Sequence, residues 1–182
     1  MNLKPQEIRT SLYHSPFYDL LYKLNADAQW RKLLGISELD IHMKDVEVLL
    51  RGFAMLIEEK YSPSMVKFLN NFSRKSKKVP EDQNQYLAQV FHAFLKSCQG
   101  LGERPFHGRK TNKFNISLFE AVFAAQCGPA FRRRDTNVGP IDSTQFEALK
   151  DDPGFAKASL EKTTSTGNVE TRLRLAKEFL VG

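Results

Sequence analysis

Apolar side chains recur every three or four residues along most of this chain, which is the spacing of one face of a helix. The longest series predicts a helix from His42 to Tyr61, with apolar positions at Val46, Leu49, Leu50, Phe53, Ala54 and Ile57. Gly52 falls inside this series. Glycine there costs about 1 kcal/mol relative to alanine, so we expect a second helix to pack closely against it.

Capping residues and prolines divide the remaining pattern into further helices. Pro16 is expected to kink or restart the first helix, and Asp27 and Gly35 to bound a short one. Other helix starts are predicted at Ser62–Pro63, Pro80, Asn115, Ser143, Asp152–Pro153 and Asn168. No stretch shows the two-residue alternation of a strand. The sequence therefore predicts an all-α fold, an irregular bundle of roughly seven to nine helices.

Two polar segments interrupt the helical pattern. The sequence SRKSKKVPEDQ at 73–83 predicts a charged connector, and it is the candidate hinge between subregions of a single helical domain, residues 1–182. The sequence GERPFHGRKTNKFN at 102–115 predicts a long loop with four basic residues.

Composition is that of a globular protein, with 41% hydrophobic residues among 182. No apolar run approaches the roughly 20 residues that span a bilayer, so we expect no membrane segment and a cytoplasmic location. The 27 Lys and Arg residues exceed the 21 Asp and Glu residues, giving a net charge of +6. This charge permits an acidic partner without requiring one.

The residues that carry catalysis or bind metals show no recognisable arrangement. Cys98 and Cys127 lie in apolar stretches and form no C-x-x-C pair, so they predict reduced, buried thiols rather than a zinc site. The phosphate-binding and hydrolase motifs G-x-x-x-x-G-K-[ST], H-E-x-x-H and G-x-S-x-G are missing from the sequence. We therefore predict no catalytic residue, no metal and no cofactor, and we do not expect an autonomous enzyme.

Several motifs match one family when they are taken in order. They are LKPQEIRTSLYHSPFYDLL (3–21), MKDVEVLLRGFAML (43–56), KYSPSMVKFLNNF (60–72), NISLFEAVFAA (115–125) and TSTGNVETRLRLAKEFL (164–180). Together they resemble the helical half of the N-terminal domain of GmrSD-type, modification-dependent restriction endonucleases. That domain also occurs in bacterial and phage-defence proteins.

In that family the helices follow a ParB/sulfiredoxin-like α/β portion with an Asp-Gly-Gln-Gln-Arg motif, which is linked to nucleotide handling and DNA restriction. That motif and the family's Phe-Glu-Arg-x-Asn-Thr-Gly-Gly stretch do not occur in this sequence, nor does the His-Me nuclease domain often fused downstream. The resemblance therefore implies a non-catalytic helical module of a restriction or defence protein. It would pack against the α/β portion or a partner subunit.

The resemblance also assigns polar residues that are either partner-facing or structural. The matched positions are Gln6, Glu7, Arg9, Lys44, Asp45, Glu47 and Arg51, and Tyr13 and His14 lie one turn after the first three. Glu7 and Arg9 are about 200° apart on a helix, so they face different directions. Lys44, Glu47 and Arg51 have the spacing of an ion-paired ladder, and the alternative is a polar wall that faces the α/β half.

Three basic segments support an alternative function, a stand-alone nucleic-acid-binding domain. We expect all three in connectors, where Phe106, Phe114 and Phe131 could stack on bases. Ordinary solvated loops explain the same pattern. The basic residues are Arg74, Lys75, Lys77, Lys78, Arg109, Lys110, Lys113, Arg132, Arg133 and Arg134.

The first helix carries more apolar residues than a short helix normally leaves in water. They are Ile8, Leu12, Tyr13, Phe17 and Leu21. Part of this surface is expected to stay exposed and to bind the α/β half, a partner subunit or a second copy of the chain, because exposed apolar patches mark interfaces.

Overall fold

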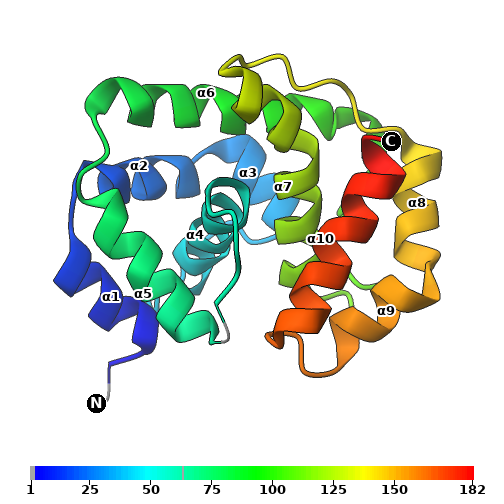
Figure 1. Ribbon diagram of the computed structural model, residues 1–182, viewed down its shortest axis with the longest axis horizontal. Coiled ribbons are helices and arrows are strands. Elements are labelled where there is room, and N and C mark those ends of the chain that lie inside the picture. Colours follow the sequence, from blue (N-terminus) through cyan, green and yellow to red (C-terminus); the bar gives the residue numbers. More distant parts are fainter. Residues whose placement is uncertain (1–2, 63) are drawn as a thin grey trace.

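The computed structural model describes residues 3–62 and 64–182, and these residues form ten α-helices, one 3-10 helix and no strand (Figure 1). The all-α prediction is confirmed, with slightly more helices than expected. The helices are α1 (Pro5–Tyr13), α2 (Pro16–Asn25), α3 (Ala28–Leu34), α4 (Lys44–Ile57), α5 (Met65–Ser76), α6 (Glu81–Ser97), η1 (Gln99–Leu101), α7 (Ile116–Arg133), α8 (Ser143–Asp151), α9 (Pro153–Leu160) and α10 (Thr166–Leu180).

Several helix ends form where the sequence places a capping residue. Pro16 begins α2 after the break that follows α1. The carboxylate of Asp27 accepts hydrogen bonds from the first-turn amides of α3, and Gly35 ends that helix with a φ of +73°. The side chain of Asn115 accepts from the Leu118 amide at the start of α7.

Other helix boundaries differ from the prediction. The helix predicted at 42–61 is shorter, because Met43 precedes it in a left-handed conformation and Glu58 is already extended. Asp142 rather than Ser143 caps α8, and Ser165 rather than Asn168 caps α10.

The helix that was predicted to start at Ser62–Pro63 starts later in the structure. α5 begins at Met65, and Ser64 before it is in an extended conformation. Pro63 lies outside the described residues.

The charged stretch at 73–83 is mostly helix rather than connector. Ser73 and Ser76 are buried in the last turn of α5, and α6 already begins at Glu81. Only residues 77–80 join the two helices, so the proposed hinge is reduced to four residues and stays a prediction.

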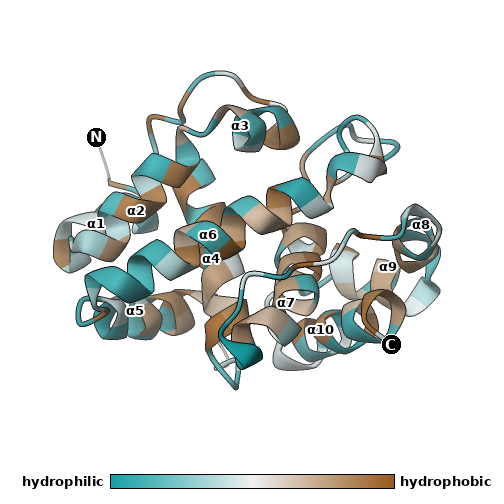
Figure 2. Cartoon of the chain, turned by 90° about the horizontal axis from the view of Figure 1, so that it is seen from above, coloured by the Kyte–Doolittle hydropathy of each residue, from teal (hydrophilic) through white to brown (hydrophobic). Residues whose placement is uncertain are grey.

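Helices α4 and α7 form the centre of the molecule. A β-carbon added at Gly52 would lie 3.0 Å from the Phe119 ring and 3.1 Å from the Phe123 ring, so the predicted close packing against Gly52 is confirmed. α10 covers another side of α7, and α6 runs across the molecule above α4 and α7 (Figures 1 and 2).

An aromatic cluster fills the core between these helices. Phe123 contacts Phe53 and Phe94 edge to face, with ring centroids 5.3 Å and 4.9 Å apart. Trp30 of α3 joins the cluster through Phe91 and Phe119. α3 is therefore fixed to the core despite its seven residues.

Candidate functional site

α1 turns its polar side toward the protein. Arg9 is only 2% exposed, although it lies on the first helix of the structure. Its Nε donates to Asn70 Oδ1 of α5 at 2.9 Å, and its Nη1 lies 3.2 Å from Glu47 Oε2 of α4. Nη1 also donates to Gln6, which is buried together with Thr10. These polar contacts hold α1 against α4 and α5.

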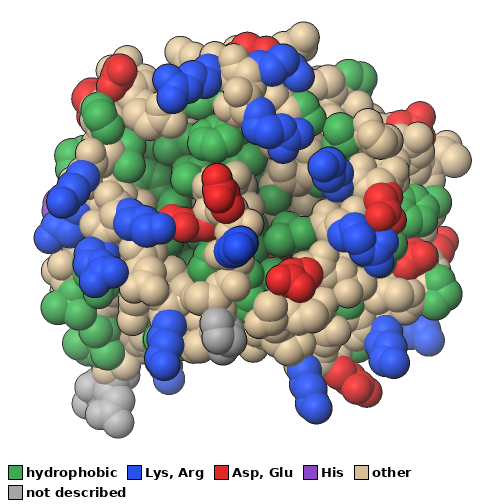
Figure 3. Space-filling view, in the orientation of Figure 1, with side chains coloured by type: hydrophobic (Ala, Val, Ile, Leu, Met, Phe, Trp, Pro, Cys, Tyr) green, Lys and Arg blue, Asp and Glu red, His purple; other side chains and the backbone are tan. Residues whose placement is uncertain are grey.

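The opposite side of α1 is apolar and faces the solvent. Leu3, just before the helix, is 63% exposed, and Ile8 and Leu12, one helical turn apart, are 44% and 61% exposed. Hydrophobic side chains gather over α1 at the lower left of Figure 3. Val66 of the neighbouring α5, one turn before Asn70, is half exposed as well. We call Leu3, Ile8 and Leu12 the outer face of α1.

Other residues of the predicted apolar stripe belong to the core. Phe17 and Leu21 of α2 are buried, so they belong to the part of the stripe that packs inside, and the part that stays exposed lies on α1. Tyr13 is half-buried and packs against the core. The break between α1 and α2 lets α2 turn its apolar side inward while the outer face of α1 stays in solvent.

The remaining polar residues near α1 lie close to the surface. Glu7 accepts a hydrogen bond from the Lys4 amide at 2.6 Å, and its carboxylate lies 3.5 Å from His42 Nδ1. Glu7 and Arg9 thus make separate contacts, as their helical spacing predicts. His14 is exposed and lies 3.2 Å from the exposed Asp19 carboxylate, and Lys44 is exposed at the start of α4.

The predicted ion-paired ladder along α4 is wrong. Glu47 pairs with Arg9 of α1, and Arg51 pairs with Glu120 of α7 at 2.7 Å. Lys44 pairs with neither. Glu47 and Arg51 therefore have their partners on other helices, because α1 and α7 pack against the face that was expected to meet solvent.

Asp45 is buried and organises the segment between α3 and α4. Its Oδ2 lies 2.7 Å from Arg31 Nη1 and accepts from the Asp40 amide at 3.0 Å. Burial alone would raise the pKa of Asp45, but hydrogen bonds from the Asp40 amide and from the Asn25 and Arg31 side chains outweigh it and lower that pKa. Asp45 is therefore a structural carboxylate that holds the loop before α4.

A second buried ion cluster joins α4, α7 and α10. Glu120 lies between Arg51 and Arg172, and its Oε1 is 2.9 Å from Arg172 Nη2. Arg172 also donates to the Ala158 carbonyl at 2.7 Å. Burial lowers the pKa of Arg172, with Glu120 acting in the opposite direction. Helix spacing did not identify Glu120 and Arg172 as functional or structural residues, because the spacing of a helix does not show that a charged side chain is buried.

The three basic segments are not all connectors. Arg74 and Lys75 lie in the last turn of α5, Arg132 and Arg133 lie in the last turn of α7, and only the segment around Arg109 is a loop throughout. Three of the ten cations have carboxylate partners. Lys75 pairs with Glu58, Arg109 with Glu147 and Asp151, and Arg133 with Asp135.

The other seven cations are exposed, and none forms an ion pair within the described chain: Arg74, Lys77, Lys78, Lys110, Lys113, Arg132 and Arg134. The phenylalanines near the basic segments are not free stacking platforms. Phe106 is fully buried, Phe114 packs against the core, and Phe131 stacks on Tyr86 with 6.3 Å between the ring centroids.

Cys98 and Cys127 are free and buried, as predicted. Burial raises the pKa of Cys98 to about 12 and raises the pKa of Cys127 well above its ordinary value. Both are therefore thiols at neutral pH rather than nucleophilic thiolates. In the described part of the chain, no group of three or more His, Cys, Asp and Glu residues could hold a metal ion, and no helix is long and apolar enough to cross a bilayer.

Comparisons with protein-family models, with curated proteins and with solved structures find no match to this chain. The geometry of the site therefore carries the functional argument. Its most unusual feature is α1, which buries a polar side and exposes an apolar one.

Proposed function

We propose that this chain is a helical docking module, and that the outer face of α1 is its contact surface. The observation that supports this proposal most strongly is the orientation of α1. Arg9 and Gln6 are buried while Ile8 and Leu12 are exposed, which reverses the usual arrangement of a surface helix.

The free energy of burying apolar side chains favours a partner that covers the outer face of α1. Fully burying a leucine or isoleucine side chain contributes about 1.5–3 kcal/mol, and this contribution is not realised while Ile8 and Leu12 meet water. The polar contacts of Arg9 with Asn70 and Glu47 fix the helix in this orientation. A partner that covers the outer face gains apolar contact area on a surface that is already ordered.

The partner that fits best is an α/β portion of the GmrSD type. The motif Gln-Glu-Ile-Arg, which carries the resemblance, lies on α1. In the resembled family this helix directly follows the α/β portion. On this proposal the chain is a non-catalytic part of a restriction or defence protein, and nucleotide and DNA chemistry belongs to the partner.

Nucleic-acid binding through the basic segments has less support. Lys75, Arg109 and Arg133 are paired with carboxylates, which reduces the charge available to phosphates. Lys and Arg side chains gather over several separate elements in Figure 3 rather than along one continuous groove.

Co-purification tests the proposal. The chain would be co-expressed with a GmrSD-type α/β portion that carries the Asp-Gly-Gln-Gln-Arg motif. We expect a stable complex with the wild type and its loss in Leu12→Glu. Because Leu12 is exposed, this variant should keep the thermal melting temperature of the wild type. A complex that forms equally well with Leu12→Glu would refute the role of the outer face.

A further inference from the structure

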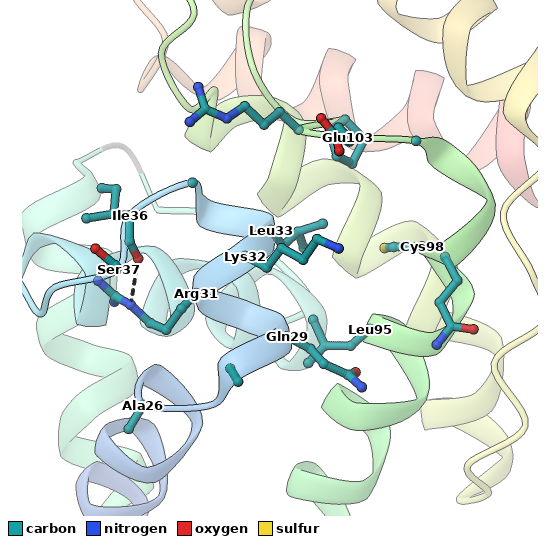
Figure 4. A pocket seen from close by; sticks show the side chains of 16 residues that line it. Ala26, Gln29, Arg31, Lys32, Leu33, Ile36, Ser37, Leu95, Cys98 and Glu103 are labelled. Carbon is teal, nitrogen blue, oxygen red and sulfur yellow. Dashed lines mark hydrogen bonds between the residues drawn. The ribbon is translucent and has the colours of Figure 1, made fainter.

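A cavity of about 890 Å³ opens between α3, the end of α6 and the loop at 102–105 (Figure 4). Small-molecule sites commonly enclose roughly 300–1,000 Å³. The cavity lies apart from the outer face of α1, since no residue of α1 lines it. We call it the α3–α6 cavity.

One part of its lining is apolar. Leu95 and Cys98 of the α6 end are buried, and Leu33 of α3 is half-buried beside them. Ile36, just after α3, is half exposed and is a further apolar residue of the lining. Because burial raises the pKa of Cys98, its side chain is a neutral thiol. It contributes apolar surface to the cavity and is not a reactive thiolate.

The other part of the lining is polar and carries a net positive charge. Lys32 and Arg104 are exposed cations, and Glu103 is the one carboxylate among the lining residues. Arg31 adds no available charge, because its guanidinium is held by Asp45 and by backbone carbonyls. Lys32 and Arg104 together with Glu103 therefore give the lining a net charge of +1, next to its apolar part.

The loop that carries Arg104 is held in place. Arg104 has a φ of +50°, its Nη1 donates to Asn112 Oδ1 at 3.3 Å, and its carbonyl accepts from the His107 amide at 3.0 Å. The His107 ring packs on Gly35 at the end of α3, where an added β-carbon would lie 2.8 Å from Nε2. The two walls of the cavity are thus joined at one end, so the space between them is defined before any ligand arrives.

We propose that the α3–α6 cavity binds a small molecule with an apolar body and one anionic group, of the class of medium-chain carboxylates. The apolar body would cover Leu33 and Leu95, and the anionic group would be held by Lys32 and Arg104. This site is independent of the docking surface on α1.

Fluorescence titration with 8-anilinonaphthalene-1-sulfonate, an apolar anion, tests the site, with decanoate as competitor. The wild type should bind one probe molecule, and decanoate should displace it. Replacing both cations, Lys32→Gln with Arg104→Gln, should weaken binding by roughly tenfold or more, because it removes the charge-assisted hydrogen bonds. Gln29→Trp should block the cavity, since Gln29 lines it and points toward Leu95 (Figure 4).

Two controls separate this site from other surfaces. Lys110→Gln removes an exposed cation outside the cavity, and Leu12→Ser alters the outer face of α1. Both should leave the affinity for the probe unchanged, with circular dichroism confirming that every variant is folded. No binding by the wild type, equal binding by the cavity variants, or loss of binding in Leu12→Ser would each overturn the proposal.

Discussion

Glu120 of α7 and Arg172 of α10 form an ion pair in which Oε1 and Nη2 are 2.9 Å apart and both side chains are 1% exposed. Glu120→Gln would leave Arg172 buried without a carboxylate. We expect this substitution to lower the free energy of unfolding by about 3–5 kcal/mol, measured by urea denaturation.

The matched control lies on α10 itself. Glu178 pairs with Arg174 at the surface, and both side chains are more than half exposed. Glu178→Gln should cost less than about 1 kcal/mol, because exposed ion pairs contribute little. Equal losses in the two variants would show that the Glu120 cluster does not hold α10 to α7.

Gly52→Ala tests the close contact between α4 and α7. Alanine gains about 1 kcal/mol of helix propensity, but overpacking against Phe119 and Phe123 costs about 1–3 kcal/mol. Because both rings are almost fully buried among other side chains, we expect the overpacking cost to exceed the helix-propensity gain, with a net loss of about 1 kcal/mol in urea denaturation. Gly100→Ala is the control, since no atom of residues 3–62 and 64–182 outside its own surroundings in the chain lies within 4 Å of its added β-carbon. A stabilising Gly52→Ala would mean that the rings can adjust.

Asp45 makes stability depend on acid pH. Its pKa is lower in the folded protein than in the unfolded chain, where an aspartate titrates at about 3.9. The stabilisation is therefore present above that value and is lost as pH falls through the lower, folded pKa. Urea denaturation between pH 7 and pH 2 should show a steep loss for the wild type at the acidic end. Asp45→Asn should be less stable at pH 7 and show a shallower loss.

The exposed Asp82→Asn serves as the control for this series. Its pH profile should follow that of the wild type. An Asp45→Asn profile as steep as that of the wild type would assign the acid sensitivity to other carboxylates.

Helix periodicity predicted the all-α fold because most helices bury one apolar face. It could not predict the partners of charged residues. The spacing of Glu47 and Arg51 shows only that they share a face of α4, whereas their partners Arg9 and Glu120 lie 38 and 69 residues away in sequence.

The orientation of α1 is a second property that helix periodicity could not predict. The pattern places Ile8 and Leu12 on one face, but it does not say whether that face meets the core. The contacts of Arg9 with Asn70 and Glu47 decide this, and they depend on α5 and α4 being in place. The motif that carries the family resemblance includes Arg9, so the sequence identified the residue but not the direction in which it points.

On the proposed function, the outer face of α1 is a docking surface. Calorimetric titration of the chain with a separately expressed α/β portion of the GmrSD type tests it most directly, using Leu12→Glu and the matched Ser11→Glu, which adds the same charge at the neighbouring exposed position. We predict that Leu12→Glu weakens binding by roughly tenfold or more, as the loss of a buried leucine implies, while Ser11→Glu changes it little. Equal effects of the two substitutions, or no binding by the wild type, would contradict the account.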